Sequence, residues 1–437
     1  MKILKLKNTL QLAVILSLVL FSYSCDKSTE KFTYVANVPI YMDYDEFRAT
    51  AITFEAPMPL ENTGKIYFKG GKIYVNELFK GIHVIDNSDP TAPNNIGFIS
   101  IPGNVDIAIK GNILYVDSYI DLLAIDISNI NNPQVTTRLE NVFEPSLPPF
   151  DETFPVAPLD HDQGVVIDWK IEKITEKIDV TGNYYYGGTR WLFTEVDALS
   201  ANSPGSGTKT YFVPNAVGVA GSMARFIIFS DYLYTINAED IKVFNISNTP
   251  EPQEGASVET ARIIETLFVY NDNLFVGSTT GMLIYSLGNP ANPTYLSMLD
   301  HFRSCDPVVV EGDYAYVTLR AGSGCGSSNS NQLDVVNIAN ITSPYLVKSY
   351  SMTGPYGLGI DNDVLFICDG DDGLKVFDAT DKTRISNNMI KHFPAINAFD
   401  IIPYNNLAMM IGSDGLYQYN YSDLDNMELL SVIPIVK

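Results

Sequence analysis

Histidine, cysteine and tryptophan are scarce in this chain, whose 437 residues include four, four and two of them. The histidines (His83, His161, His301 and His392) are far apart, and His161, between two aspartates, has no second ligand at metal-site spacing. The patterns typical of serine hydrolases, zinc proteases and P-loop nucleotide-binding proteins are absent. The sequence therefore predicts no catalytic residues, no metal site and no cofactor.

Basic residues are also few. The chain has 28 Lys and Arg against 51 Asp and Glu, so its formal net charge is −23. A surface this acidic repels the phosphate groups of nucleic acids and of anionic lipids. We therefore expect no nucleic-acid partner, and the acidity favours solubility outside the cytoplasm.

The first 24 residues differ from the rest of the chain. Three lysines precede an apolar run of twelve residues (10–21), which is too short to span a bilayer and is typical of a secretory signal. Cys25 follows Ser22 and Ser24, which resembles a lipoprotein cleavage site, although Tyr23 is bulky. We expect residues 1–24 to be a lipoprotein signal peptide and Cys25 to carry the lipid. An ordinary signal peptide, leaving Cys25 free, is the alternative.

The rest of the chain is built from a repeat. Seven short apolar segments end at a small polar residue, and the next turn is rich in proline and asparagine. These polar residues are Asp86, Asp126, Asn245, Ser286, Asn337, Asp378 and Asn420. Successive spacings are 40, 119, 41, 51, 41 and 42 residues. Upstream of each segment, Gly, Asn or Asp separates two apolar runs and can adopt the positive φ of a two-residue hairpin turn.

Each unit therefore reads as four antiparallel strands, A to D, which is the pattern of a β-propeller blade. We predict an all-β, seven-bladed β-propeller of four-stranded antiparallel blades, with repeats within residues 61–437. Residues 25–60 would form a tether and an edge segment. The long 119-residue spacing places extra sequence at 140–222. A large loop insertion between the second and third repeats is favoured over two degraded blades.

The strand C segments IHVID, LLAID, IKVFN and LKVFD (82–86, 122–126, 241–245 and 374–378) resemble the LVIVD-repeat family. The resemblance covers about residues 64–433, and the last unit, LYQYN, departs furthest. It implies a β-propeller in an exported or surface protein, often a lipoprotein of Bacteroidetes-like bacteria. The family has no agreed activity and no defined catalytic set, so the resemblance assigns no catalytic residue.

Cys305 and Cys325 belong to the fifth unit, at the start of strand A and in an enlarged loop, 319–332, after strand B. Because strands A and B are antiparallel, both positions lie at the same end of the blade. We expect a disulfide between them, with two unpaired thiols as the alternative. Cys368 is expected to be a small packed apolar residue. The repeat register predicts that His83, in a strand C, points outward.

The acidic stretch CDGDDG (368–373) lies between strands B and C of the sixth unit. Asp369 and Asp371 match the first ligands of a calcium EF-loop, but the later ligand positions do not match. A tight turn is therefore favoured over a loose cation site formed by Asp369, Asp371 and Asp372.

Both tryptophans lie in the insertion, and the segment GNYYYGGTRW occupies 182–191. Aromatic residues beside an arginine can stack on sugar rings or anchor a protein partner, and they can equally form a small core. B–C and D–A connections share one face of a propeller, so the insertion and the loops 319–332 and 369–373 are expected on that face. The candidate ligand-binding residues are Trp169, Tyr184, Tyr185, Tyr186, Arg190, Trp191, Asp369, Asp371 and Asp372.

Two functional classes remain. The first is a binding or scaffold module for a protein or glycan at the cell envelope, and the second is an extracytoplasmic hydrolase or lyase acting on glycans or peptides. An enzyme would place charged side chains on strands A, which line the channel, whereas these strands are mostly apolar, as in VVVEG at 308–312. The binding module is therefore favoured. We expect a monomer at the outer membrane or cell surface, or in the periplasmic leaflet, that contacts the membrane through its lipid only.

Overall fold

The computed structural model describes residues 29–179, 224–247, 251–300, 307–321 and 331–436. The chain forms two compact units. The larger unit includes residues 41–149, 161–167 and 211–437, and the smaller includes 1–40, 150–160 and 168–210. Several residues singled out from the sequence lie outside the described residues: Cys25, Tyr184, Tyr185, Tyr186, Arg190, Trp191, Cys305 and Cys325.

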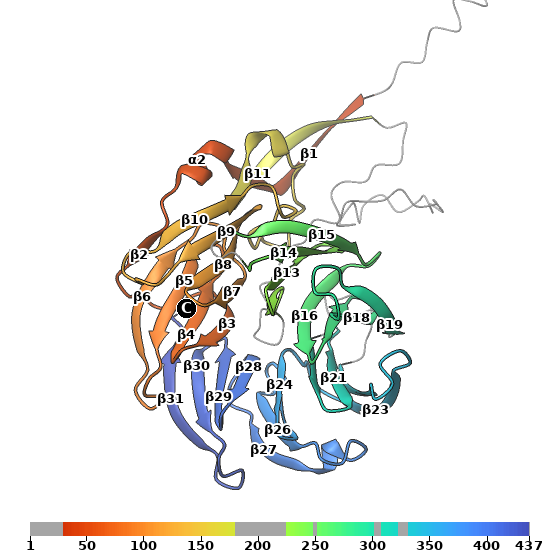
Figure 1. The fold of residues 1–437 in the computed structure, drawn as a ribbon. Coiled ribbons are helices and arrows are strands. Elements are labelled where there is room, and N and C mark those ends of the chain that lie inside the picture. Colours follow the sequence, from red (N-terminus) through yellow and green to blue (C-terminus); the bar gives the residue numbers. More distant parts are fainter. Residues whose placement is uncertain (1–28, 180–223, 248–250, 301–306, 322–330, 437) are drawn as a thin grey trace, which may run out of the picture. The chain divides into compact units, whose positions relative to one another are not determined.

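The larger unit is a seven-bladed β-propeller, as predicted (Figure 1). Each blade is an antiparallel sheet whose strands A to D follow one another in the chain. Blades 1 to 3 contain β3 (Thr63–Lys69), β4 (Lys72–Glu77), β5 (Gly81–Asp86) and β6 (Asn94–Ser100); β7 (Ile107–Lys110), β8 (Ile113–Ser118), β9 (Asp121–Asp126) and β10 (Gln134–Leu139); and β12 (Phe226–Phe229), β13 (Tyr232–Asn237), β14 (Asp240–Asn245) and β15 (Gln253–Glu259). Blades 4 and 5 contain β16 (Ile264–Tyr270), β17 (Asn273–Ser278), β18 (Gly281–Ser286) and β19 (Thr294–Asp300); and β20 (Val308–Glu311), β21 (Tyr314–Leu319), β22 (Gln332–Asn337) and β23 (Tyr345–Ser351). Blades 6 and 7 contain β24 (Leu358–Asp361), β25 (Val364–Cys368), β26 (Leu374–Asp378) and β27 (Met389–Phe393); and β28 (Ala398–Tyr404), β29 (Leu407–Gly412), β30 (Gly415–Asn420) and β31 (Glu428–Pro434).

The seven strands A form a closed ring around the propeller axis. In chain order, β3, β7, β12, β16, β20, β24 and β28 each contact the next, and β28 returns to β3. Because β7 lies directly against β12, blade 3 follows blade 2 in space as well as in sequence. Residues 140–225 therefore connect two adjacent blades.

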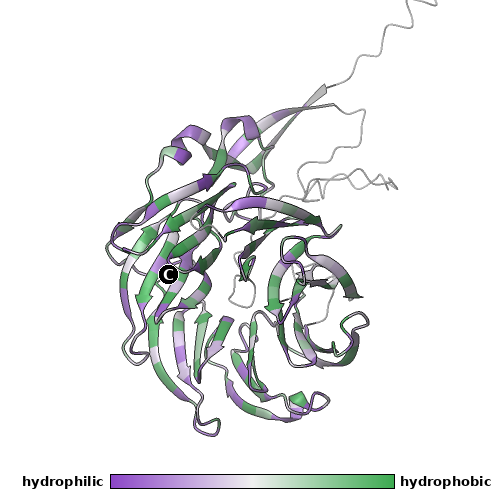
Figure 2. Cartoon of the chain, in the orientation of Figure 1, coloured by the Kyte–Doolittle hydropathy of each residue, from purple (hydrophilic) through white to green (hydrophobic). Residues whose placement is uncertain are grey.

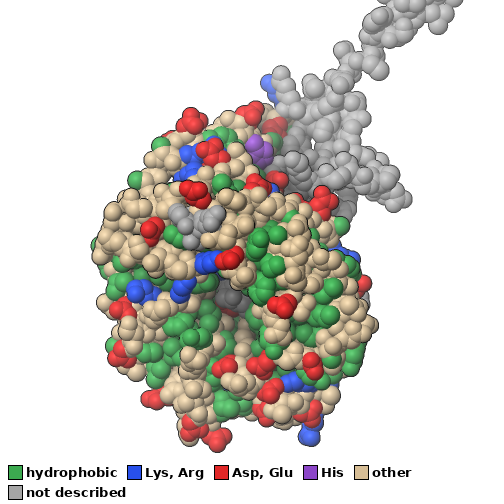
Figure 3. Space-filling model, viewed as in Figure 1, with side chains coloured by type: hydrophobic (Ala, Val, Ile, Leu, Met, Phe, Trp, Pro, Cys, Tyr) green, Lys and Arg blue, Asp and Glu red, His purple; other side chains and the backbone are tan. Residues whose placement is uncertain are grey.

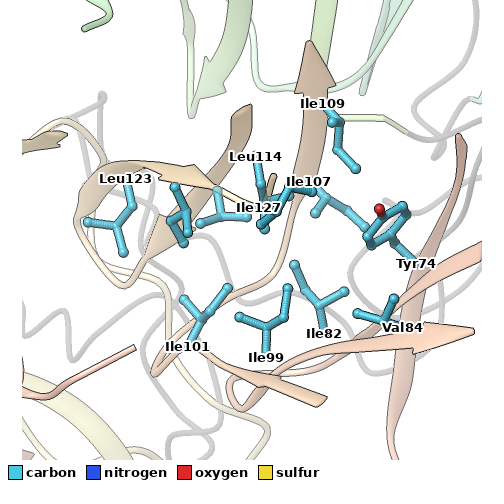
Figure 4. Close-up of a cluster of buried hydrophobic side chains, with 12 residues drawn as sticks. Tyr74, Ile82, Val84, Ile99, Ile101, Ile107, Ile109, Leu114, Leu123 and Ile127 are labelled. Carbon is cyan, nitrogen blue, oxygen red and sulfur yellow. The ribbon is translucent and has the colours of Figure 1, made fainter. Parts of the chain in front are cut away.

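A cluster of buried apolar side chains fills each of the seven junctions between blades. Figure 4 shows the junction of blades 1 and 2, where Ile82 and Ile99 of blade 1 belong to the same cluster as Leu123 of blade 2. Every blade is thus buried on both faces. This explains why strands B and C carry apolar residues on both faces of the blade, and Figure 2 shows apolar residues throughout the blades.

A two-residue hairpin turn joins strands A and B in every blade, as the sequence predicts. The first residue of each turn has a φ between 50° and 58°. Glycine tolerates this left-handed conformation at no cost, and asparagine at little cost. The seven residues are Gly70, Gly111, Ser230, Asn271, Gly312, Asn362 and Asn405.

The polar residue that ends each strand C fixes the turn into strand D. Its side-chain oxygen accepts a hydrogen bond from the backbone N–H two residues further on, at 3.0 Å for Asp86 and 2.7 Å for Asp126. This is an Asx turn, or its serine equivalent, and it replaces a backbone hydrogen bond by a local side-chain one. The other five are Asn245, Ser286, Asn337, Asp378 and Asn420.

Strand D forms the outer edge of each blade and contains one extra residue relative to strand C. Such a β-bulge twists an edge strand and weakens its ability to pair with other chains. Blade 1 differs from the others, because β2 (Thr53–Glu55) pairs with β6 as a fifth strand.

The ring closes between blades 7 and 1 without exchanging a strand. The side-chain amides of Asn87 and Gln418 bond each other reciprocally at 2.8 and 2.7 Å, although 331 residues separate them. Leu60 packs in the apolar cluster of this junction, and its carbonyl accepts a hydrogen bond from the N–H of Val436 at 2.8 Å. The two ends of the repeat array are therefore joined by polar and apolar contacts together.

The segment before blade 1 contributes α2 (Tyr44–Ala49) to the larger unit, and η1 (His161–Gln163) and η3 (Ile385–Asn387) are short 3-10 helices. None of the helices among the described residues has the length and apolar content that a bilayer crossing requires. In the smaller unit, β1 (Thr29–Met42) pairs with β11 (Val165–Asp179). Buried Asn37 donates to the carbonyls of Asp151 and Phe154, both at 2.8 Å.

The Asx turns that use aspartate make the free energy of unfolding depend on pH in the acidic range. The hydrogen bonds from Ser88 hold the pKa of Asp86 below its ordinary value, and those from Thr380 do the same for the pKa of Asp378. The stability that these carboxylates contribute is present above their ordinary pKa, about 4, and is lost as the pH falls through their lower folded values. We expect the native urea midpoint to fall between pH 5 and pH 2.5.

Asparagine provides the matched control, because Asn245 and Asn337 accept the same hydrogen bond in other blades. We expect the triple variant D86N/D126N/D378N to lose less stability over this pH range than the native chain, while remaining close to it at pH 7. Identical acid profiles for the two proteins would contradict the assignment.

Candidate functional site

One end of the propeller carries the B–C and D–A connections, and we call it the loop face. B–C connections bond the D–A connections beside them, as Phe79 N–H does to the Asn104 carbonyl at 2.8 Å and Thr279 N–H to the Ile263 carbonyl at 3.0 Å. Three buried carboxylates hold the connections of this face together. They are Glu77, Asp121 and Asp369.

Asp369 is buried and fully engaged. Its carboxylate accepts hydrogen bonds from the backbone N–H groups of Thr353, at 3.0 Å, and Gly354, at 2.7 Å, in the D–A connection. The Lys375 ammonium lies 2.5 Å from Asp369 and also 2.5 Å from Asp372. The hydrogen bond from Lys375 is the main cause of the lowered pKa of Asp372, and it outweighs the effect of burial.

The acidic stretch 368–373 is therefore a tight turn, as favoured from the sequence. Gly373 has a φ of 80°, and a Cβ at this position would lie 1.9 Å from the Phe393 carbonyl oxygen, so only glycine fits. Asp371 accepts a hydrogen bond from the Asn397 side chain. Ligand binding by Asp369, Asp371 and Asp372 stays a prediction, and of the three Asp369 is the least accessible.

Blade 1 repeats this arrangement with other residues. The buried carboxylate of Glu77 accepts from the N–H groups of Asn62, at 2.6 Å, and Glu61, at 3.2 Å, and lies 3.0 Å from His83 Nε2. Burial acts to raise the pKa of Glu77, but the hydrogen bonds from His83 and these amides outweigh it and lower the pKa. The prediction that His83 points outward is wrong, because the ring is fully buried against Phe98.

The two acid–base clamps share a sequence signal. In each, an acid at the end of strand B precedes a base in strand C by six residues, as Glu77 precedes His83 and Asp369 precedes Lys375. The register explains the spacing, since the tight B–C turn returns the chain to the same end of the sheet. The signal is visible in the sequence once the repeat register is known.

Asp121, in blade 2, anchors the segment before the propeller. Arg48 of α2 donates to its carboxylate through Nε at 3.0 Å and through Nη2 at 3.1 Å, and Arg138 donates at 3.0 Å. Both guanidinium groups also lie over the Phe47 ring, at 5.3 and 5.6 Å from its centroid. Bidentate pairing combined with cation–π contact fixes α2 against blade 2.

A second group of charges lies near the axis, at the starts of strands A and the ends of strands B. Lys65 forms a buried ion pair with Asp106. Asp106 also accepts a hydrogen bond from Arg225 N–H at 2.9 Å, which links blades 2 and 3. Asp117 accepts from the N–H groups of Val105, at 2.7 Å, and Asp106, at 2.9 Å.

Further charged residues lie at this end of blades 4, 5 and 7. Glu265 and Arg320 interact electrostatically, and the Arg320 guanidinium lies 4.1 Å from the centre of the Tyr356 ring. Buried Asp400 of blade 7 interacts electrostatically with Lys65 of blade 1. We call this set the axial charge ring: Lys65, Asp106, Asp117, Arg225, Glu265, Arg320 and Asp400.

The axial charge ring corrects the expectation of an apolar inner wall. Asp117 and Arg320 lie at the ends of strands B, and the other five residues lie at the starts of strands A, so the mostly apolar composition of strands A did not reveal the set. Burial shifts the charged groups toward their neutral forms. It raises the pKa of Asp117 to about 6, and it lowers the pKa of Lys65 far below its ordinary value.

The remaining predicted residues lie in different environments. Trp169, in the smaller unit, is half-buried and packs edge-on against Phe150 at 5.6 Å, which agrees with the core-packing alternative. Cys368 is buried among the apolar residues between blades 6 and 7, as predicted, and burial raises the pKa of its thiol. Among the described residues, no three His, Cys, Asp or Glu side chains are arranged to hold a metal ion.

Comparison with protein families agrees with the repeat register. The LVIVD repeat model matches residues 103–140 and 303–352. The first match covers the strands of blade 2 and the second those of blade 5. This chain carries LVIVD repeats. No curated protein matches the sequence.

Several solved structures are similar to this LVIVD-repeat propeller. The computationally designed protein Ika8 has a TM-score of 0.48 at 9% identity, with 87% of this chain and 89% of that chain covered. Hsv2 of Kluyveromyces lactis has a TM-score of 0.46 at 10% identity, with 85% and 97% covered. BamB of Moraxella catarrhalis has a TM-score of 0.44 at 10% identity, with 88% and 97% covered.

The clamp in blade 6 predicts a large effect for one lysine. We expect K375M to lower the free energy of unfolding by about 3–5 kcal/mol, because it leaves the buried Asp369 carboxylate without its cation. The matched control is K242M, at the same position of strand C in blade 3. Among the described residues, the ion-pair partner of Lys242 is exposed Glu254, at 3.2 Å, so the loss of Lys242 should cost about 1 kcal/mol or less. Equal shifts of the urea midpoint for both variants would contradict the clamp.

Asp117 predicts the opposite pH trend from the Asx turns. The folded protein keeps this proton up to about pH 6, whereas an unshifted aspartate releases it near 3.8. The contribution to stability therefore falls as the pH rises from about 4 to about 6, and at neutral pH it is lower by about 3 kcal/mol. We expect D117N, which keeps an oxygen to accept the same amides, to remove this decline in urea unfolding measured from pH 4 to pH 7. A native profile in D117N would show that Asp117 does not hold this proton.

Proposed function

We propose that this protein is a cell-envelope lipoprotein whose propeller is a non-catalytic binding module for a protein or glycan, presented on the loop face. The observation that carries the proposal is the way this face is fixed. Glu77, Asp121 and Asp369 each bind backbone N–H groups of a connection together with a cationic or imidazole side chain. Loops held in this way lose little conformational entropy when a ligand binds, which favours tight and specific recognition.

The charge of the chain limits the kinds of partner that it can bind. Acidic side chains are scattered over the face of the propeller seen in Figure 3, with a smaller number of Lys and Arg side chains among them, and the chain as a whole is strongly acidic. A neutral glycan or a protein surface with basic groups fits such a surface best. The aromatic residues Trp169, Tyr184, Tyr185, Tyr186, Arg190 and Trp191 remain the proposed contacts within the 140–222 segment.

Membrane attachment is proposed through Cys25, with residues 1–24 removed. Only three residues separate Cys25 from the start of β1 at Thr29. Three extended residues span about 10 Å, so the lipid would hold the smaller unit at the membrane surface. We also propose the Cys305–Cys325 disulfide, which would close the enlarged loop of blade 5 in an oxidising compartment.

A specific observation keeps an enzyme as the second candidate. The axial charge ring places Lys65, with a lowered pKa, near Asp117, whose pKa is raised to about 6. Perturbed acid–base groups in a concave site are typical of hydrolases and lyases. The same charges also join blades 1, 2, 3 and 7, which is a structural role.

Metabolic labelling with a palmitate analogue tests the anchor. We expect label in the native protein, none in C25S, and full label in C368S, whose cysteine is buried. Ligand capture is then tested with a glycan array and with cross-linking in the host. Deletion of residues 140–222 should abolish capture while the propeller stays folded by circular dichroism. If the native protein cleaves a glycan or peptide and D117N does not, the binding-module proposal is wrong and the protein is an enzyme.

A further inference from the structure

Two aromatic residues on the loop face are held in a strained backbone conformation. Phe79, in the B–C turn of blade 1, has a φ of 62°, and Tyr119, in the B–C turn of blade 2, has a φ of 53°. Bulky side chains rarely adopt this left-handed conformation, and residues that do so gather at functional sites. In the other blades, the described B–C turn residues with a positive φ have a small side chain or none, and they are Ala238, Gly370 and Gly373.

One glycine ties the two turns together. Gly103, in the connection between blades 1 and 2, donates its N–H to the Phe79 carbonyl at 2.9 Å and accepts from the Tyr119 N–H at 3.3 Å. A Cβ on Gly103 would lie 2.4 Å from a ring atom of Tyr119, so the ring rests directly on the glycine backbone. Phe79, Tyr119 and Ile120 belong to one apolar cluster, and we call these three side chains the aromatic patch.

The aromatic patch is covered by a segment of the chain itself. Phe47 of α2 belongs to the same cluster, and its ring meets the Tyr119 ring edge to face at 5.7 Å. Of the six residues of α2, all of which the structure describes, Phe47 alone is buried. Arg48 follows it and pairs with Asp121 through two hydrogen bonds at 3.0 and 3.1 Å. The patch is therefore occupied by an aromatic ring next to a guanidinium group.

The contacts of α2 allow it to leave while the propeller stays folded. A helix of six residues is not stable by itself, so α2 depends on the contacts of its side chains. The chain from residue 48 to residue 59 contains no buried residue. Without Arg48, the Asp121 carboxylate would keep the Arg138 guanidinium at 3.0 Å and the Asn141 N–H at 2.9 Å. The departure of α2 therefore leaves no unpaired carboxylate in a buried place, which would be its largest cost.

We propose that the aromatic patch is a recognition site of the loop face and that α2 is a displaceable cap on it. A partner protein binds by replacing α2 with a segment that presents an aromatic side chain next to an arginine. The ring takes the place of Phe47 over Tyr119, and the guanidinium takes the place of Arg48 on Asp121. Arginine suits this site better than lysine, because it pairs with a carboxylate through two parallel hydrogen bonds. This inference rests on the proposed binding function and specifies where and what the module binds.

Hydrogen exchange in the unmodified full chain tests whether the cap opens. Phe47 N–H donates to the Asp43 carbonyl at 3.0 Å, and Thr50 N–H donates to the Phe47 carbonyl at 3.2 Å, so both amides report on α2. We expect them to exchange about a hundredfold faster than the amides of β8 and β9, because local opening exposes them. Exchange at the rate of these strands would mean that α2 leaves only when the propeller unfolds, and it would overturn the proposal.

A peptide supplied separately tests the chemistry of the site. A fluorescent peptide with the sequence of residues 41–52 is titrated into the full chain carrying F47A/R48A, whose own cap is weakened, and its anisotropy is measured. We expect saturable binding, and binding to the native chain about tenfold weaker, because the native cap competes from within the same molecule. The control peptides carry F47A or R48K, and each should bind about tenfold more weakly than the native sequence.

Protein variants locate the site. Added to F47A/R48A, Y119A should weaken peptide binding about tenfold, because the ring that meets Phe47 is lost. The matched control is Y295A, since Tyr295 is 53% exposed on strand D of blade 4, and it should change binding by less than about twofold. Circular dichroism checks the fold of each variant. If F47A/R48A does not fold, R48K provides the milder opening of the cap.

The possible outcomes distinguish this inference from the proposed function. The inference is wrong if the peptide does not bind saturably to the variant with the weakened cap, or if Y119A and Y295A bind it equally. Capture of a glycan or host protein that Y119A leaves unchanged would also overturn it. That last result would keep the binding module and place its site elsewhere on the loop face.

Discussion

The closed ring of strands A is the constraint on which the rest of this structure depends. Each blade is too thin to bury its own apolar residues, and it is covered on both faces only when a neighbour stands on either side. The seven junctions are therefore all filled only when the last blade packs against the first, and we call this closing junction the seam. The seam between blades 7 and 1 has no exchanged strand, so the Asn87–Gln418 pair and Leu60 must hold it. Removing any one blade would expose the apolar faces of both of its neighbours.

The features that could be read from the sequence are those that a few adjacent residues determine. Gly70 can adopt the left-handed conformation of the A–B turn, and Asn405 does so at the same position of blade 7. Asp86 closes its own Asx turn. Both kinds of turn therefore recur in the seven blades and can be recognised in the sequence. The axial charge ring could not be read in this way. Lys65 and Asp106 are 41 residues apart and meet only because their blades are neighbours. Burial of His83 depends equally on Phe98, a partner in another strand.

The loop face shows how a repeat protein makes a site without losing its scaffold. Acids at the end of strand B face inward from a turn, where an unpaired carboxylate would be costly. Each is instead saturated by the amides of the adjoining connection and by one base. The same groups that would suit catalysis are thereby used to hold backbone. This supports the proposal that the loop face is a preformed recognition surface.

Departures from the repeat carry more information than the repeat itself. Symmetry requires only what all seven blades share, so a segment present once has another reason to exist. The strand β2 is such a segment, and it shows how a blade edge of this protein accepts a further strand. Bulges in every strand D discourage pairing along the whole edge, but β6 pairs with β2 just beyond its bulge. An edge that is closed to long strands and open to a short one is selective.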